Sequence, residues 1–292
     1  MARMAGTAAI AEALIDTGVV STTPVAGGTL CTATRLRLSD GRSAIIKTRP
    51  QAPQGFFARE AAGLDWLREA DGVRVPEVLG FNDESLVLTW VEPVKPSVEA
   101  AEAFGRALAT THGAGADAFG APEDGFIGAL PLPNRPTDSW AEFFATRRVL
   151  PYVKAAVDRR ALTTDQAKTI ESAMRRLPEL AGPDEPPARL HGDLWSGNVI
   201  WGSDGQVWFV DPAAHGGHRE TDLAMLSLFG IPHLQRVLDA YLEAAPLADG
   251  WEDRLALHQL HPLLVHAVTS GGSYGSRAAT VAQSLLEGLP RR

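Results

Sequence analysis

The stretch HGDLWSGNVIW, residues 191–201, decides the fold of this chain. It places an acid, Asp193, five positions before an amide, Asn198, with glycines at 192 and 197 and an apolar run directly afterwards. Gly, Asn, Asp and Ser are the usual residues of turns, so an ordinary turn would account for the glycines. The alternative is that Asp193 and Asn198 face one small polar volume, and the rest of the sequence has to separate the two interpretations.

The apolar run after Asn198 and the segment QVWFV predict a hairpin whose second strand ends at Asp211. Val207, Phe209 and Asp211 share one face of that strand, which brings the Asp211 carboxylate beside the loop of Asn198. Oxygen atoms of an amide and a carboxylate suit Mg²⁺, which completes its shell with water and substrate phosphates. Asp193 is then left to act as a base.

This division of labour fits phosphoryl transfer from ATP. A metal ion neutralises charge on the phosphates, while a carboxylate orients the attacking hydroxyl group and accepts its proton. Base, amide and second acid also follow one another in this order in the catalytic loop and metal-binding segment of a protein kinase. Three polar residues in two loops also arise by chance, so an independent signal is needed.

The N-terminal part of the chain supplies that signal. Lys47 ends the predicted strand SAIIK, and Glu60 begins the predicted helix that follows. Glu60 precedes Leu64 and Leu67 by four and seven positions and therefore shares their buried face. A buried charge needs a partner, and a Lys47–Glu60 pair would place the lysine on the α and β phosphates of ATP. A surface lysine and a solvated glutamate are the alternative.

Two glycines, Gly27 and Gly28, lie between the first two predicted strands. A glycine turn can bring backbone N–H groups close to phosphates, which makes this segment a candidate phosphate loop. An ordinary hairpin connection is the alternative.

The N-terminal segment MARMAGTAAIAEALIDTG predicts an amphipathic helix, and strand patterns with one helix after the sheet's third strand follow up to residue 91. Helical periodicity dominates residues 92–292. We expect an α+β fold with a five-stranded N-lobe and a larger helical C-lobe, divided near the prolines that follow residue 92. In the C-lobe we expect helices near residues 138–158, 163–177, 219–245, 250–268 and 276–288, interrupted only by the hairpin.

Composition limits the partners. The net charge of −8 argues against a nucleic acid partner, which would require a basic face. One cysteine, Cys31, rules out an internal disulfide framework and fits a reducing compartment. Glu12 and Asp16 interrupt the N-terminal stretch where a secretory signal would be apolar, and the longest uncharged stretch contains three histidines, so we expect no membrane span. We expect a cytoplasmic protein of undetermined oligomeric state.

With these residues in order, the chain resembles the fructosamine kinase (ketosamine 3-kinase) family, one of the protein-kinase-like phosphotransferases that include aminoglycoside and choline kinases. The segments that carry the resemblance are FFAREAAGL (56–64), VRVPEVLG (73–80), LPLPNRPTDSWAEFFATRR (130–148), HGDLWSGNV (191–199) and DPAAHGGHRETDLAMLSLFG (211–230). The chain departs from the usual family pattern at Thr89, after the two glycines, and in the segment VTSGGSY (268–274).

The resemblance implies a two-lobed kinase-like fold and ATP-dependent phosphorylation of the sugar 3-hydroxyl of ketoamines, the Amadori adducts of glycated amines. The phosphorylated adduct then decomposes, so the role would be deglycation repair of small ketoamines or glycated proteins. Asp193 matches the catalytic aspartate, while Asn198 and Asp211 match the Mg²⁺ ligands. Lys47 and Glu60 match the phosphate-positioning pair of the family, and Trp90 and Val91 match the hinge that binds adenine.

Candidate acceptor contacts lie near the catalytic positions: Trp195, two residues after the base, and His215, His218, Arg219 and Glu220 after the metal aspartate. Trp195 could pack on a sugar or a cationic amine, or support the loop as a core residue. Glu220 could pair with the ketoamine nitrogen; alternatively, Arg219 and Glu220 form a structural ion pair or cap the helix that starts there. We interpret Asp222 as a structural tie to the catalytic loop and the histidines at 258, 261 and 266 as core or pocket residues.

Two other functions stay open at this point. The first is a kinase for another hydroxyl compound, such as an aminoglycoside or an amino alcohol. The second is a nucleotide-binding pseudokinase that acts as a scaffold, which the complete set of Lys47, Glu60, Asp193, Asn198 and Asp211 disfavours.

Overall fold

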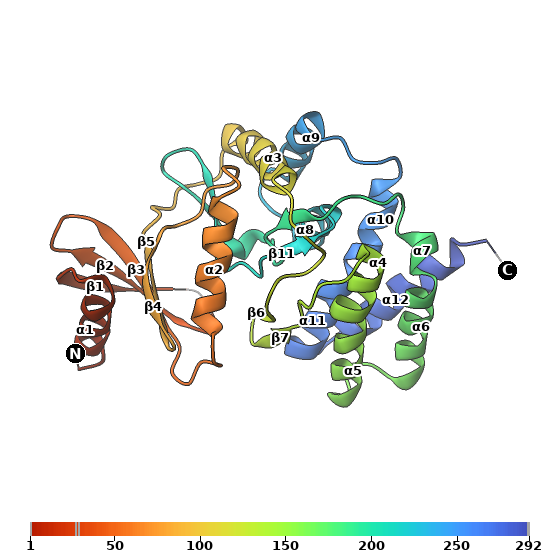
Figure 1. Cartoon of the computed structure of the whole chain (residues 1–292), viewed down its shortest axis with the longest axis horizontal. Helices are drawn as coiled ribbons and strands as arrows, with labels where there is room; N and C mark the ends of the chain where they lie inside the picture. Colours follow the sequence, from red (N-terminus) through yellow and green to blue (C-terminus); the bar gives the residue numbers. More distant parts are fainter. Residues whose placement is uncertain (1, 27, 29, 291–292) are drawn as a thin grey trace.

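The computed structural model describes residues 2–26, 28 and 30–290, and it has two lobes (Figure 1). In the N-lobe, an antiparallel sheet with strand order β1-β2-β3-β5-β4 lies between two helices. The expected five-stranded sheet is therefore confirmed. The elements of this lobe are α1 (Ala2–Ile15), β1 (Val19–Val25), β2 (Thr32–Leu38), β3 (Ser43–Thr48), α2 (Phe56–Arg68), β4 (Val78–Asn82) and β5 (Ser85–Thr89).

Strand alternation decides which side chains of the sheet reach each helix. Ile46 on β3 is fully buried and belongs to the apolar cluster that packs against α1. Its neighbour Ile45 belongs to the cluster that contains the buried face of α2. Since successive side chains of a strand point to opposite faces, Lys47 shares the face of Ile45 and points toward α2.

The C-lobe is mainly helical. The chain enters it through the connection between β5 and α3, and we propose that the boundary between the lobes lies in this connection, between residues 91 and 92. Its elements are α3 (Val98–Gly113), β6 (Gly125–Ile127), β7 (Leu130–Leu132), α4 (Trp140–Phe143), the π-helical turn η1 (Phe144–Val149), α5 (Leu150–Asp158), α6 (Thr164–Arg175), α7 (Leu177–Leu180), β8 (Ala188–Leu190), the 3-10 turn η2 (Ser196–Asn198), β9 (Val199–Trp201), β10 (Val207–Phe209), β11 (His215–Gly217), α8 (Glu220–Phe229), α9 (Leu234–Ala244), α10 (Trp251–His258), α11 (Leu260–Ser270) and α12 (Tyr274–Glu287).

Two of the predicted long helices are divided. The helix expected over 219–245 ends as α8 at Phe229, because Gly230 has a positive φ of 78° and Pro232 follows it. The helix expected over 250–268 is interrupted at Gln259. Pro262 explains this break, since a proline has no N–H to give to the carbonyl group four residues earlier and its ring clashes with that carbonyl.

The expectation of a single hairpin in the C-lobe is wrong. The predicted hairpin is present as β9 and β10, with Val199 opposite Phe209. Two further antiparallel pairs, β6 with β7 and β8 with β11, accompany it. All of these strands have three residues, which is too short for an alternating pattern, but the turn residues Asp204 and Gly205 mark β9 and β10 in the sequence.

The two lobes share an apolar core, which fixes the floor of the space between them. One cluster of buried residues joins Phe57 and Leu64 of α2 to Phe104 of α3, Phe209 of β10 and Tyr241 of α9. Within the described residues, no helix combines the length and the apolar character that a membrane crossing requires.

Candidate active site

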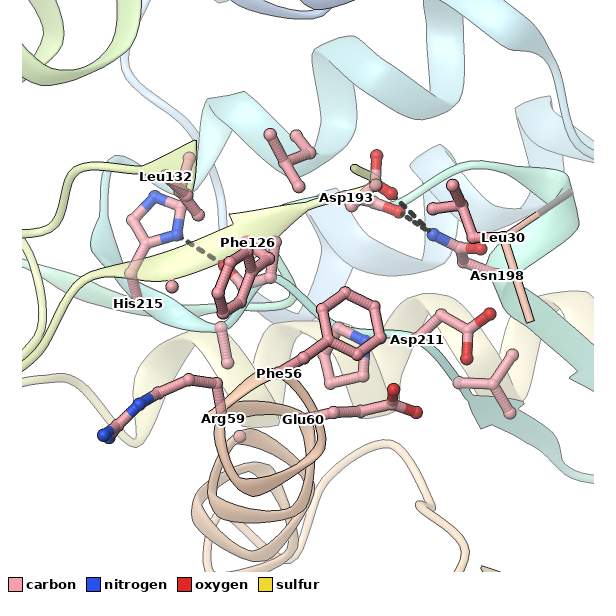
Figure 2. Close-up of a pocket in the computed structure, with 18 of the residues that line it drawn as sticks. Leu30, Phe56, Arg59, Glu60, Phe126, Leu132, Asp193, Asn198, Asp211 and His215 are labelled. Atoms are coloured by element: carbon pink, nitrogen blue, oxygen red, sulfur yellow. Dashed lines mark hydrogen bonds between the residues drawn. The ribbon is translucent and has the colours of Figure 1, made fainter. Parts of the chain in front are cut away.

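The catalytic loop connects β8 to β9 and carries Asp193 and Asn198. The Nδ2 group of Asn198 donates to the backbone oxygen of Asp193 at 2.8 Å and to its Oδ2 atom at 2.9 Å (Figure 2). Because both bonds use the amide nitrogen, the Oδ1 atom of Asn198 takes no part in the contact with Asp193. The two side chains face one polar volume, as the sharper interpretation of the sequence predicts.

Asp222 holds this loop from behind. Its carboxylate, on α8, accepts hydrogen bonds from the backbone N–H of His191 at 2.8 Å and of Gly192 at 3.0 Å. His191 donates from Nε2 to the carbonyl of Val210, and its Nδ1 atom accepts from the N–H of Asp193. The interpretation of Asp222 as a structural tie is confirmed, and the loop is fixed on both sides of its acid.

Burial sets the protonation of Asp193. Removal from water disfavours the carboxylate and raises its pKa to about 7, although the hydrogen bond from Asn198 acts in the opposite direction. A carboxyl group with a pKa near the working pH is well matched to accepting a proton from an alcohol. The geometry and the pKa therefore both suit the proposed role of a base.

A three-membered ion cluster joins the two lobes beside this loop. The Nζ atom of Lys47 lies 2.6 Å from Glu60 on α2 and 2.5 Å from Asp211, which follows β10. Burial disfavours the Lys47 ammonium, but the two carboxylates outweigh burial and raise its pKa. Burial likewise disfavours the Asp211 carboxylate, but Lys47 lowers the pKa of Asp211 below its usual value. The predicted Lys47–Glu60 pair is present, and the third member was not anticipated.

A cavity of about 1690 Å³ lies between the lobes and contains all the predicted catalytic side chains. At one end it is apolar, with side chains from both lobes: Ala33, Ile45, Leu88, Val91, Ile200 and Val210. An apolar slot of this kind suits a planar base. Of the two predicted hinge residues, Trp90 uses its backbone N–H within the sheet, donating to the carbonyl of Ser43 at 3.1 Å. Of these two residues, Val91 is therefore the one whose N–H stays a candidate donor to adenine.

Ala26, Gly28, Leu30 and Cys31, between β1 and β2, line the neighbouring part of the cavity and are called the phosphate loop below. Gly28 lines the cavity and has a φ of 81°, a conformation that glycine adopts without strain. Gly27 lies outside the described residues. Cys31 also lines the cavity, and burial raises the pKa of its thiol, which keeps it protonated.

Two of the predicted acceptor contacts face the cavity. Trp195 is 39% exposed and lines the cavity with Asp193, and its indole lies over Gly197. It is therefore not a core residue. His215 is buried in the cavity wall, and its Nδ1 atom donates to the carbonyl of Ala213 (Figure 2). Burial holds the pKa of His215 well below its usual value, so its imidazole is neutral.

The other three predicted contacts lie outside the cavity, which corrects the expectation that they meet the acceptor. Glu220 is fully buried and receives two hydrogen bonds from Arg254, at 2.6 and 3.0 Å. Arg219 pairs with Glu185 through two bonds of 2.7 Å. His218 is also buried, and its ring packs on Trp140. Arg219 and Glu220 are therefore structural, as the alternative expects, but each pairs with a residue distant in the sequence and not with the other.

His218, Glu220 and His258 come close enough together to suggest a metal site. Their surroundings argue against one. The Nδ1 atom of His218 accepts the backbone N–H of Glu220, so its Nε2 atom keeps the proton that a metal would have to displace. Arg254 already occupies both oxygens of Glu220. We interpret the group as a balanced structural cluster. His261 is buried as expected, and His266 lines the cavity.

Sequence reasoning missed the cavity wall formed by residues 116–136. This segment includes β6 and β7 and lines the cavity. Its only sequence signal is the motif at 130–148, which contributes to the family resemblance without indicating a role.

The fold and the site together define a protein-kinase-like phosphotransferase: a sheet lysine paired with a helix glutamate above a loop that carries an acid, an amide and a second acid. Comparison with known proteins then narrows this class. The profile of the fructosamine kinase family matches residues 4–288, and the chain belongs to this family.

Relatives of known name and structure agree with this assignment. A ketoamine kinase of Enterococcus faecium, named as probable, is 37% identical over 259 residues, which cover 87% of this chain and 91% of the relative. A crystal structure from Thermobifida fusca, described as a fructosamine-3-kinase, has a TM-score of 0.92 and 47% identity over 96% of this chain and 98% of that chain. A chloroplastic protein-ribulosamine 3-kinase of Arabidopsis thaliana is 29% identical, over 91% of this chain and 82% of the relative.

Proposed function

We propose that this protein transfers the γ-phosphoryl group of ATP to the 3-hydroxyl group of a ketoamine. The observation that carries the proposal is the position of Asp193, held by Asn198 and facing a cavity that also contains Lys47 and Asp211. The comparisons support the family's reaction, and the site contains the side chains that this reaction needs. Small ketoamines and glycated proteins are both proposed acceptors, and the cytoplasmic location stays a prediction.

Asn198 and Asp211 would hold Mg²⁺, and their chemistry fits it. Asp211 stays ionised because Lys47 lowers its pKa, and its side chain is 51% exposed to the cavity. The Oδ1 atom of Asn198 offers the second hard oxygen ligand. When bound, the ion would neutralise charge on the β and γ phosphates. Lys47 would exchange its contact with Asp211 for the phosphates while it keeps Glu60.

The proton and the phosphoryl group then move in opposite directions. Asp193 orients the acceptor hydroxyl and takes its proton as the bond from that oxygen to the γ phosphorus forms and the bond from phosphorus to the β-phosphate oxygen breaks. Trp195 would cover one side of the acceptor, and its indole face suits a sugar or the cationic amine of the adduct.

An assay of ADP release tests the proposal. The purified protein is supplied with MgATP and with fructosyl-lysine, a ribose-derived ketoamine of lysine, kanamycin or choline, and the phosphorylated product is identified by mass spectrometry and NMR. We expect turnover with the ketoamines and a phosphate at the sugar 3-oxygen. Turnover confined to kanamycin or choline would refute the assignment of the acceptor. ATP binding without turnover of any acceptor would refute the proposal that the protein is a kinase. A glycated protein in the same assay tests the larger acceptor.

A further inference from the structure

The hairpin of β6 and β7 is one of the parts of the C-lobe that contact helix α2, and it does so at the start of the helix. Phe126 on β6 packs on Phe56, the first residue of α2, with ring centroids 5.3 Å apart (Figure 2). Glu123, two residues before β6, forms an ion pair with Arg59 on the same helix. The hairpin therefore contacts α2 through both an apolar and a charged pair.

The same hairpin is fixed firmly to the C-lobe on its other side. Arg148, which is 2% exposed, donates to the carbonyl of Pro133 at 2.5 Å and to the Oδ1 atom of Asn134 at 2.6 Å. Tyr152 donates to the carbonyl of Pro131 at 2.8 Å. Among the described residues, no carboxylate forms an ion pair with Arg148. Its guanidinium instead holds the segment after β7 through Pro133 and Asn134. Arg148 comes from η1, and π-helical turns occur frequently at functional sites.

The contacts on α2 involve the face that carries Glu60. Phe56, Arg59 and Glu60 are related by three and four positions on the helix, so their side chains project toward the same side. A shift of Phe56 relative to the hairpin would shift Glu60 with it. Glu60 has to stay close to Lys47, from which it lies 2.6 Å away in this structure.

We propose that Phe126 and Glu123 are positioning residues for phosphoryl transfer, which hold α2 where Glu60 meets Lys47. The hairpin thereby connects the acceptor end of the cavity to the nucleotide end. The proposal rests on the proposed role of Lys47 and Glu60 in binding ATP. Neither Phe126 nor Glu123 is assigned a contact with the reacting atoms.

The hairpin also gives the acceptor a route to influence ATP binding. Ile127, Leu130 and Leu132 line the cavity from this hairpin, and Gly128 at its tip lies against Leu30 of the phosphate loop. An acceptor bound against these residues would stabilise the contacts with α2. Coupling between two sites is reciprocal, so a ketoamine should raise the affinity for MgATP by the same factor as MgATP raises the affinity for the ketoamine, on the order of 5-fold or more.

The first test replaces Phe126. We expect Phe126→Ala to lower kcat/KM for ATP by roughly 10- to 100-fold, because small displacements of positioning groups have effects of this size. Calorimetry should show weaker MgADP binding without any acceptor, and Phe126→Leu should restore most of it. Phe81→Ala is the matched control, since Phe81 is 46% exposed on β4 and is not among the residues that line the cavity. A folded Phe126→Ala variant with wild-type MgADP affinity and wild-type KM for ATP would overturn the proposal.

The second test exchanges the charges of the ion pair, and it stands even if Phe126→Ala fails to fold. Arg59→Glu and Glu123→Arg should each lower kcat/KM for ATP, and the double variant should recover most of the loss. Equal losses in the single and double variants would contradict the proposal. Because MgADP binding requires no acceptor, it distinguishes this proposal from the proposed function: a wild-type protein that is inactive on ketoamines would refute the function and leave the binding test valid.

Discussion

Two clusters of charged side chains in this protein use the same chemical groups and differ in charge balance and in access. In the cavity, one ammonium, Lys47, faces two carboxylates, Glu60 and Asp211, and the Asp211 side chain is 51% exposed. In the C-lobe interior, the carboxylate of Glu220 is matched by the guanidinium of Arg254, and Glu220 is fully buried. An excess of exposed carboxylate suits a site that takes up a cation with its phosphates, whereas a balanced and closed pair suits structure.

The pKa values follow the same division. Burial opposes ionisation of Glu220, but the imidazole of His258, 3.2 Å away, and the hydrogen bonds from Arg254 outweigh it and lower its pKa to about 2. Among the residues that the structure describes, the Asp193 carboxylate accepts a hydrogen bond from the amide of Asn198 alone, and burial raises its pKa to about 7. Asp193, which must gain and lose a proton, thus has few partners that stabilise its ionised form. The structural carboxylate of Glu220 has several and stays ionised.

The largest expected effect in the comparison comes from Asp193→Asn. We expect kcat to fall by on the order of 10²–10⁴, because the amide cannot accept the proton of the acceptor hydroxyl. The ADP-release assay with a ketoamine measures this effect, and the melting temperature should stay close to that of the wild type. Full turnover by the variant would exclude Asp193 as the base.

Glu220→Ala should show the opposite pattern. Removal of this carboxylate leaves Arg254 buried and unpaired, so the free energy of unfolding should fall by about 3–5 kcal/mol. Urea denaturation measures this loss, and kcat per folded molecule should stay near the wild-type value. Unchanged stability together with a raised KM for the ketoamine would show that Glu220 contacts the acceptor.

The pH dependence of activity should reflect the cavity rather than the interior. Because burial raises the pKa of Asp193 to about 7, its basic form predominates only above that pH. We expect kcat/KM to fall about tenfold for each pH unit below 7 and to level off above it. A pH profile of kcat/KM for the ketoamine, recorded with saturating MgATP, measures this dependence. The residual activity of Asp193→Asn should not show the decrease below pH 7. A wild-type profile that stays flat across this range would contradict the assignment.

Arg219→Ala should have the smallest effect. Its guanidinium binds Glu185 and the carbonyls of Ala245 and Pro246 at the edge of the interior, where it is 20% exposed. We expect a loss of about 1–2 kcal/mol in unfolding free energy, read as a small decrease in melting temperature, with unchanged KM for the acceptor. An increase in that KM without loss of stability would show that the segment contacts the ketoamine after all.

Much of the catalytic set could be predicted because its signals are local. Asp193 and Asn198 are separated by five positions, and Glu60 shares a helical face with Leu64 and Leu67. Helix boundaries were predicted less well, since the breaks at Gly230 and before Pro262 depend on how single residues act within a long apolar pattern. Glu220 was assigned to the acceptor because it follows Asp211 closely, and nothing near it in the chain revealed its partner Arg254, 34 residues later.

By itself the sequence determined the residue types for phosphoryl transfer, the division into a β-rich and a helical lobe, and the family. Only the tertiary structure decided which charged side chains face the cavity, because that depends on pairs distant in the chain: Lys47 meets Asp211 across 164 positions. The physical reason is that the cost of burying a charge is decided by its partners in space. Periodicity shows that a residue is buried, and it does not show which group compensates its charge.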